Sequence, residues 1–168
     1  MTKTNAFTID VEDYFQVSAF EHSIDRNNWA HLEHRVSANI DQSLQILSDQ
    51  SVKATFFTLG WVAERYPQLI TRIVENGHEL ASHGYAHQRV SDLNCAEFKA
   101  DLIKAKNILE DISGQSIVGY RAPSYSIGKK NIWALEVLAE TGHQYSSSIY
   151  PIQHDHYGYP EAPRFKFR

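Results

Sequence analysis

The chain has 168 residues, of which 42% are hydrophobic and 21% are charged, and its formal net charge is −4. This balance predicts one globular domain over residues 1–168 rather than a disordered chain, and without a Lys/Arg run it gives no support to nucleic acid or an anionic membrane as partner. One cysteine cannot form an internal disulfide, and the first residues lack the apolar core of a signal peptide, so we expect a cytoplasmic protein. No apolar run approaches ~18 residues, so we expect no membrane span.

Short apolar runs alternate along the chain with segments of helical periodicity. Runs rich in β-branched and aromatic residues predict strands, and apolar residues three or four positions apart predict helices. In chain order we predict a strand at 6–9, a helix at 36–47, a strand at 54–59, a helix at 67–76, a strand at 79–82, a helix at 95–114, a strand at 117–120, a helix at 131–140 and a strand at 145–148.

Turn and capping residues set several of these boundaries. Gly60 is expected to end the strand at 54–59, and Pro67 suits the first turn of the next helix. Gly77 follows that helix as its C-terminal stop. Asn94, with Glu97 three residues later, has the pattern of a capping box and predicts the start of a long helix.

The alternation predicts an α/β fold, with a parallel sheet or barrel covered by helices. In such folds the functional groups gather at the carboxyl ends of the strands. Polar side chains follow three of the predicted strands at that end: Asp10, Glu12 and Asp13 after the first, His83 and His87 after the third, and Arg121 with Pro123 after the fourth. We therefore expect these residues to meet at one rim.

The stretch SHGYAHQ at residues 82–88 places His83 and His87 four residues apart. Such a pair is often a surface or capping pair, but carboxylates and an arginine on the same rim favour a metal site. Two imidazoles and one carboxylate leave one position of zinc, or of a similar divalent ion, open for water. Gly84 disfavours a regular helix here, so we expect a loop folded around the ion.

Three segments, FTIDVEDYF, SHGYAH and YRAPSY, resemble in order and separation the first three motifs of the polysaccharide deacetylases, the NodB-homology superfamily or carbohydrate esterase family four. The resemblance extends over residues 7–148. It implies a distorted (β/α) barrel and the hydrolytic removal of acetyl groups from N-acetylated sugars. The motif DVEDYF also resembles the corresponding motif of the family branch associated with bacterial exopolysaccharide biosynthesis. That branch is similar to intracellular-type peptidoglycan deacetylases and allantoinase-like members.

The resemblance implies roles for the residues that match these motifs. Asp10 matches the general base, and Arg121 matches the arginine that orients this base. His83 and His87 match the two metal-binding histidines, with zinc as the expected ion. In this mechanism the base takes a proton from the water that attacks the acetamide carbonyl.

The third metal ligand stays open between Glu12 and Asp13. The common family pattern has two adjacent aspartates, whereas this chain reads Asp10-Val11-Glu12-Asp13. Strand alternation places Asp10 and Glu12 on one face, but this rule weakens at a strand end. We expect the carboxylate that is not a ligand to cap a helix or to lie on the surface.

The residues after Arg121 are expected to form the groove wall and to bind the oxyanion. Pro123 belongs to the groove-wall motif, and a backbone N–H of Ser124 or Tyr125 would meet the developing oxyanion. The family usually has an aromatic residue directly after this proline. Here Ser124 occupies that position and Tyr125 follows it.

The family also supplies a general acid from a histidine in a late Leu-x-His motif, which is not found before Arg168. We therefore expect an N-terminal fragment of the domain that acts poorly alone on its substrate, an N-acetylated glycan or glycan precursor. The alternatives are a non-catalytic metal or sugar binder and an allantoinase-like amidohydrolase. His154, Asp155 and His156 could form a second metal site, although a solvated loop is expected. The oligomeric state has no signal in the sequence.

Overall fold

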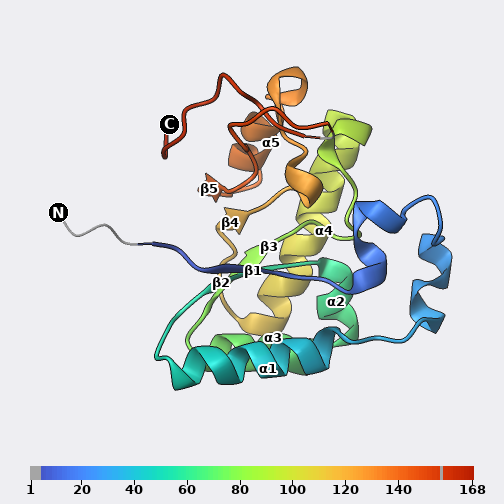
Figure 1. Cartoon of the computed structure of the whole chain (residues 1–168), viewed down its shortest axis with the longest axis vertical. Coiled ribbons are helices and arrows are strands. Elements are labelled where there is room, and N and C mark those ends of the chain that lie inside the picture. Colours follow the sequence, from blue (N-terminus) through green and yellow to red (C-terminus); the bar gives the residue numbers. More distant parts are fainter. Residues whose placement is uncertain (1–4, 156) are drawn as a thin grey trace.

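The computed structural model describes residues 5–155 and 157–168, and within them five parallel strands form one sheet (Figure 1). The strands lie side by side in chain order: β1 (Thr8–Val11), β2 (Thr55–Thr58), β3 (Glu79–Ser82), β4 (Gly119–Tyr120) and β5 (Tyr145–Ser146). Parallel neighbours in chain order require a crossover after each strand, so all carboxyl ends point to the same rim.

Helices provide these crossovers and surround one side of the row of strands (Figure 1). They are α1 (Val36–Asp49), α2 (Gly60–Arg65), α3 (Pro67–Glu75), α4 (Cys95–Ser113) and α5 (Ala134–Glu140). A parallel sheet with helices outside confirms the predicted α/β architecture, with the sheet forming part of a (β/α) barrel. No helix among the described residues is long and apolar enough to cross a membrane, and the cytoplasmic location stays a prediction.

Two apolar clusters hold the helices against the sheet. The larger one joins strands β1–β3 to α1, α2 and α3 and includes the fully buried Phe56, Leu59 and Ile70. The smaller one joins β4 to α4 and α5 around Leu102 and Tyr120. Each such side chain contributes roughly 1.5–3 kcal/mol on burial, so this packing is what fixes the strand ends relative to one another.

The capping residues act as the sequence predicts. The Asn94 side chain accepts hydrogen bonds from the backbone N–H groups of Ala96 and Glu97, and the Glu97 carboxylate accepts one from Asn94 N–H. Gly114 ends α4 with a φ of 66°, a left-handed conformation that glycine adopts without a steric penalty. Helix α4 is thereby fixed at both ends beneath the site loops.

Three local predictions differ from the structure. Strand β1 continues to Val11, so Asp10 lies within the strand rather than after it. Gly60 starts α2 instead of only ending a strand, and this helix of six residues is too short to show a period in the sequence. Strands β4 and β5 have two residues each, because only these residues pair with a neighbouring strand.

The alternation along β1 separates the core from the site. Ile9 and Val11 face the larger apolar cluster, whereas Thr8 and Asp10 face the opposite side of the sheet. On that side the Arg121 guanidinium lies over the Phe57 ring, 4.1 Å from its centroid. Polar groups therefore lie on the face of the sheet away from the helices.

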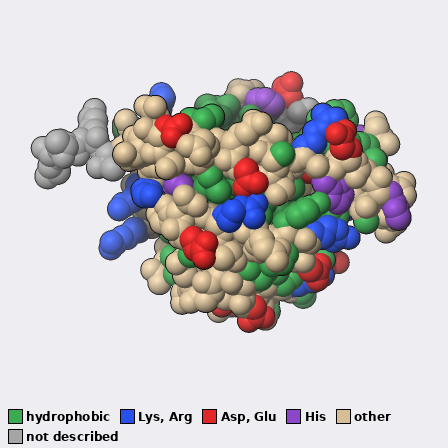
Figure 2. Space-filling model, turned by 90° about the horizontal axis from the view of Figure 1, so that it is seen from below, with side chains coloured by type: hydrophobic (Ala, Val, Ile, Leu, Met, Phe, Trp, Pro, Cys, Tyr) green, Lys and Arg blue, Asp and Glu red, His purple; other side chains and the backbone are tan. Residues whose placement is uncertain are grey.

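Charged side chains are mixed on the molecular surface. On the face shown in Figure 2, Lys and Arg side chains lie among Asp and Glu side chains and form no continuous basic area. Arg72 of α3, for example, donates to Asp41 of α1 over 2.9 Å. This face lacks the concentrated positive charge that nucleic-acid binding requires.

Candidate metal centre and catalytic base

The carboxyl ends of the strands bring the predicted polar residues to one rim. Glu12 follows β1, His83 follows β3, and Arg121 follows β4. Neighbouring strands carry them, since His83 N–H donates to Thr58 O of β2 and Arg121 N–H donates to Ser82 O of β3, each over 2.9 Å. The site thus consists of residues far apart in the sequence that are fixed by the backbone of the sheet.

Glu12, His83 and His87 form the one group of potential metal ligands found within residues 5–155 and 157–168. Their ligand atoms all lie within 4.8 Å of one another. Glu12 Oε2 lies 3.0 Å from His87 Nε2 and 3.9 Å from His83 Nε2. Two imidazoles and one carboxylate that converge in this way form the donor set of catalytic zinc sites.

The Glu12 carboxylate supports this assignment through its surroundings. Its Oε2 atom is buried, and its 3.0 Å contact with His87 Nε2 lacks the geometry of a regular hydrogen bond. Burial acts to raise the pKa of Glu12, but the nearby His87 and His83 outweigh it, so the pKa is lowered and the carboxylate form is favoured. A buried carboxylate oxygen without a regular hydrogen bond, next to two imidazole nitrogens, fits a divalent cation.

The orientation of His83 leaves one ring nitrogen available. His83 Nδ1 donates to the carbonyl oxygen of Arg121 over 2.8 Å, because a carbonyl can only accept. In the neutral ring, Nε2 then carries no proton, and it faces Glu12 and His87. Burial lowers the pKa of His83 and thereby favours the neutral imidazole, the form that binds metal ions.

The loop from His83 to His87 depends on glycine and on α4. Gly84 has a φ of +76°, and a Cβ atom at this position would lie 2.7 Å from Asp101 Oδ2 of α4. His87 itself has a φ of 53°, which is uncommon for a residue with a side chain. Asp101 also accepts from Tyr85 N–H, at 3.1 and 3.2 Å to its two oxygens. The predicted loop around the ion is therefore a constrained turn.

The start of α2 holds the same loop from the other side. Gly60 N–H donates to Gly84 O and Trp61 N–H donates to Tyr85 O, each over 2.9 Å. These N–H groups lie in the first turn of α2 and have no partner within the helix. The short helix that sequence periodicity missed thus positions the loop that carries both histidines.

Asp13 has a different role from its neighbour Glu12. The Asp13 side chain is 3% exposed, and its oxygens accept from the N–H groups of Tyr14 (2.9 Å), Arg35 (2.7 Å) and Val36 (3.0 Å). It therefore caps the 3₁₀ turn after β1 and the first turn of α1. Of the two carboxylates that the sequence left open, the structure brings Glu12 to the histidines and holds Asp13 at a helix terminus.

Asp10 and Arg121 form a nearly buried ion pair beside this cluster. Arg121 Nη1 donates to Asp10 Oδ1 over 2.6 Å, and the side chains are 7% and 27% exposed, respectively. Arg121 Nη2 also donates to Thr8 Oγ1 and to Ser147 Oγ, each over 3.0 Å. The sequence interpretation did not single out Thr8 or Ser147, although strand alternation placed Thr8 on the face of Asp10. These three hydrogen bonds fix the guanidinium, and with it the carboxylate.

The segment after Arg121 forms a tight turn at the rim. Ser124 and Tyr125 have positive φ values of 53° and 49° in the 3₁₀ turn Pro123–Tyr125. Tyr125 N–H donates to Ala122 O over 3.1 Å, so this group is already engaged. The Ser124 hydroxyl lies 2.6 Å from the hydroxyl of Ser18. Serine in place of an aromatic residue thus makes a contact with the segment that follows β1.

The aromatic side chain expected in this motif is supplied one position later. The Tyr125 ring lies 5.6 Å from the Arg121 guanidinium. It also packs against the rings of Tyr150 and Tyr157, with centroid separations of 5.4 and 5.9 Å. The rim after Arg121 therefore carries an aromatic cluster, although its residue order differs from the common pattern.

Comparison with known proteins identifies the family. Residues 23–146 match the family described as polysaccharide deacetylase. The chain belongs to this family. Within these residues lie His83, His87 and Arg121, whereas Asp10 and Glu12 precede them. The matched region thus contains three of the site residues, and the two carboxylates lie before it, in and directly after β1.

Individual relatives of the chain are consistent with this family. The chain is 35% identical over 94 residues to a peptidoglycan-N-acetylglucosamine deacetylase of Bacillus cereus, covering 55% of the chain and 34% of the relative. It is 31% identical over 96 residues to a chitooligosaccharide deacetylase of a Bradyrhizobium species, covering 57% and 42%. The matched part therefore spans well under half the length of these relatives.

The fold is shared with solved structures. A Mycobacterium smegmatis protein assigned to the polysaccharide deacetylases superposes with a TM-score of 0.73 at 30% identity, over 86% of this chain and 50% of that one. The distorted (β/α) barrel that the sequence motifs imply is thereby confirmed for this part of the domain.

His143 and His154 lie apart from the cluster. The His154 ring stacks on the Tyr157 ring with centroids 4.1 Å apart, and His156 lies outside the described residues. His143 is buried beside Thr141 at the end of α5, with 3.0 Å between its Nδ1 and the hydroxyl. In the described part of the chain, His154 and Asp155 join no second group of metal ligands.

Proposed function

We propose that this polysaccharide deacetylase removes N-acetyl groups from an amino-sugar glycan or its precursor by metal-dependent hydrolysis. The observation that carries the proposal is the Asp10–Arg121 ion pair beside the Glu12, His83 and His87 cluster. A protein that only binds a metal ion or a sugar does not need a carboxylate fixed by an arginine next to the ligands. A hydrolase needs this carboxylate as a base that takes a proton from water.

The ion that we propose is zinc, held by Glu12 Oε2 and the Nε2 atoms of His83 and His87. Bound there, it would lower the pKa of a coordinated water and polarise the acetamide carbonyl. The chain's own contribution is the preorganised donor set. The hydrogen bond from His83 Nδ1 to Arg121 O fixes one imidazole, and the turn at Gly84 fixes the path of the loop to the other.

Asp10 is the residue that we propose as general base. Its Oδ1 accepts from Arg121 Nη1, so the arginine holds the carboxylate group in one orientation. Thr8 and Ser147 hold the arginine in turn. In this arrangement Asp10 receives the proton of the attacking water while Arg121 stays protonated and acts as a positioning residue.

For the oxyanion we propose the backbone N–H of Ser124. The Tyr125 N–H already donates to Ala122 O, which leaves Ser124 as the better of the two donors predicted from the sequence. Pro123 and the Tyr125 ring then line the groove next to it. Pro123 and Tyr125 lie in the 3₁₀ turn that follows Arg121. The short segment 121–125 therefore contains both the arginine that holds the base and the proposed oxyanion donor.

Acetate release from N-acetylglucosamine oligomers tests the proposal, with long incubations, because a chain that spans under half the length of its relatives is expected to act slowly alone. Protein dialysed against a chelator should release little acetate, and added Zn²⁺ should restore the release. Asp10→Asn should keep the metal but lower turnover by about 10²-fold or more, because the base is lost and the ligands remain. Asp49→Asn at the end of α1 is a matched control that should behave as wild type. Acetate release that does not depend on metal, or is unchanged in Asp10→Asn, would contradict the proposed mechanism.

A further inference from the structure

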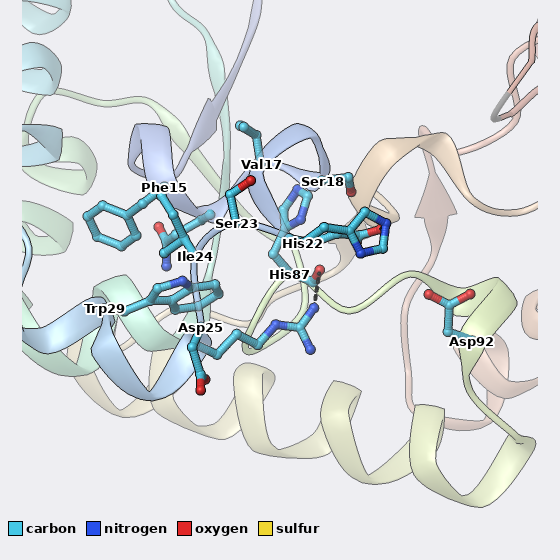
Figure 3. A pocket seen from close by; sticks show the side chains of 13 residues that line it. Phe15, Val17, Ser18, His22, Ser23, Ile24, Asp25, Trp29, His87 and Asp92 are labelled. Atoms are coloured by element: carbon cyan, nitrogen blue, oxygen red, sulfur yellow. Dashed lines mark hydrogen bonds and ion pairs between the residues drawn. The ribbon is translucent and has the colours of Figure 1, made fainter.

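The two proposed imidazole ligands are held in different ways. His83 is held through its ring, since Nδ1 donates to Arg121 O over 2.8 Å. His87 is held through its backbone, because its carbonyl oxygen accepts a hydrogen bond from Arg26 Nη2 over 3.3 Å, drawn as a dashed line in Figure 3. Arg26 lies 61 positions before His87 and outside the three segments that resemble the family motifs.

We propose that Arg26 is a positioning residue for the metal site and that it acts on the ion through His87. The inference rests on the proposed function and adds to it a residue outside the ligand set. The hydrogen bond from the Arg26 guanidinium to the His87 carbonyl holds the backbone of His87 in one conformation. It thereby sets the direction in which the imidazole leaves the loop.

The backbone conformation of His87 is the first argument. Its φ of 53° lies in the left-handed region, which is unfavourable for a residue with a side chain. Such a conformation persists only where the surrounding contacts hold it. Arg26 supplies a contact of this kind at the carbonyl group of His87 itself. The hydrogen bond therefore favours the observed conformation over the common ones, in which the carbonyl points elsewhere.

The other contacts of the loop are the second argument, since they lie on either side of His87. Helices α2 and α4 hold residues 84–85 through backbone hydrogen bonds. The ion pair of Arg89 with Glu21 holds the chain two residues after His87. Between these attachments, the side chain of Arg26 reaches the loop at His87. Loss of this side chain would release the part of the loop that carries a proposed ligand and leave both ends attached.

The position of Arg26 in the fold is the third argument. It is the first residue of the 3₁₀ helix Arg26–His31, which the Asp25 carboxylate caps by accepting a backbone hydrogen bond over 2.9 Å. Trp29 of this helix is 3% exposed, and its ring packs against Trp61 with centroids 5.5 Å apart. The donor therefore comes from a short helix that is anchored in the apolar core.

The charge of Arg26 alone would have the opposite effect on a metal ion. A guanidinium near the cluster repels a divalent cation, so removal of its charge alone should strengthen zinc binding. The hydrogen bond to His87 should strengthen zinc binding, because it holds a ligand in place. The sign of the change in zinc affinity therefore distinguishes a positioning residue from a residue that acts only through its charge.

Zinc titration of the full chain tests the inference. Arg26→Met keeps the length of the side chain and removes its donors. Arg26 is exposed and borders a pocket of about 650 Å³, so this substitution does not disturb the core. Arg72→Met is the matched control, because it removes the same charge where Arg72 pairs with Asp41 on helices α3 and α1. For each variant we would also record the thermal midpoint in chelator and the visible spectrum with Co²⁺, which depends on coordination geometry.

We expect Arg26→Met to bind Zn²⁺ at least about tenfold more weakly than wild type, which corresponds to about 1.4 kcal/mol. Its Co²⁺ spectrum should change and its thermal midpoint in chelator should not. Arg72→Met should match wild type in zinc affinity and in the Co²⁺ spectrum. Equal or tighter zinc binding by Arg26→Met, or an equal loss in Arg72→Met, would overturn the inference. So would a lower thermal midpoint together with an unchanged Co²⁺ spectrum.

The same preparations separate this inference from the proposed function. Weaker zinc binding by Arg26→Met, without acetate release by wild type from N-acetylglucosamine oligomers, would support the positioning role and contradict the deacetylation. Metal-dependent acetate release by wild type, with unchanged zinc binding in Arg26→Met, would support the deacetylation and overturn the positioning role.

Discussion

The carbonyl oxygen of Arg121 accepts a hydrogen bond from Nδ1 of His83 over 2.8 Å. The same residue uses its guanidinium to hold Asp10. One residue therefore orients a proposed metal ligand through its backbone and the proposed base through its side chain. A substitution at this position removes only the second of these interactions, which allows them to be studied separately.

Arg121→Gln should keep the metal and lose turnover. The backbone carbonyl still accepts from His83, so bound zinc should stay close to the wild-type amount. Without the guanidinium, Asp10 loses its 2.6 Å partner, and we expect the turnover number to fall by about 10²-fold or more. Metal analysis and acetate release on the same preparation check both statements. A large loss of zinc in this variant would show that the side chain, too, supports the cluster.

Glu12→Gln and Asp13→Asn should have opposite effects. Glu12→Gln removes the proposed carboxylate ligand and should strongly weaken zinc binding with little loss of stability. Asp13→Asn should keep zinc but lower the free energy of unfolding by about 1–2 kcal/mol, because the Asp13 oxygens accept from three backbone N–H groups. Zinc titration and urea unfolding of each variant are the measurements. Strong zinc loss in Asp13→Asn alone would reverse the assignment.

The sequence predicted this pair of carboxylates but could not choose between them, and the structure shows why. Asp13 is held by the N–H groups of Arg35 and Val36, more than twenty positions further along the chain. A local pattern has no information about this distant helix terminus. Thr8 and Ser147 were missed for the same reason, since their contacts with Arg121 join β1, β4 and β5.

The predictions that succeeded depended on local periodicity and on strand ends. Helix α1 follows from apolar spacing, strand β3 follows mainly from its place in the alternation of strands and helices, and the rim position of His83 follows from the end of β3. The segment at residues 14–31 has no such period. It is held by aromatic contacts, such as the Phe15 and Trp29 rings with centroids 5.9 Å apart and the Trp29 and Trp61 rings 5.5 Å apart. These contacts fix the path of the segment beside the site, which the sequence alone did not indicate.

His83→Ala and His87→Asn should each remove about one equivalent of bound zinc. Asparagine is chosen at position 87 because it tolerates the φ of 53° better than alanine does. His154→Ala should leave the zinc content unchanged, since His154 lies outside the cluster. Metal analysis after dialysis is the test. Unchanged zinc in both cluster variants would rule out the proposed site.

The last prediction concerns how the free energy of unfolding changes as the pH falls below neutrality. Burial, together with the nearby Lys106, lowers the pKa of His143 from 6.5 to about 4, while a backbone hydrogen bond with Leu138 and the charge of Glu110 act in the opposite direction. Between these values the unfolded chain binds a proton at this histidine that the folded chain does not. Folding stability should therefore be complete above pH 6.5 and fall as the pH drops towards 4, by at most about 3 kcal/mol from this group.

Asp101 acts with the opposite sign over part of this range, because burial raises its pKa to about 6, and the folded chain then binds the extra proton. Wild type and variant must therefore be compared, rather than one curve interpreted alone. His143→Gln should flatten the decline in unfolding free energy between pH 6.5 and 4, measured by urea denaturation in excess chelator so that metal release does not contribute. His22→Gln, at a histidine whose side chain is 92% exposed, is the matched control. Parallel curves for wild type and His143→Gln would show that burial of this imidazole does not govern the acid instability.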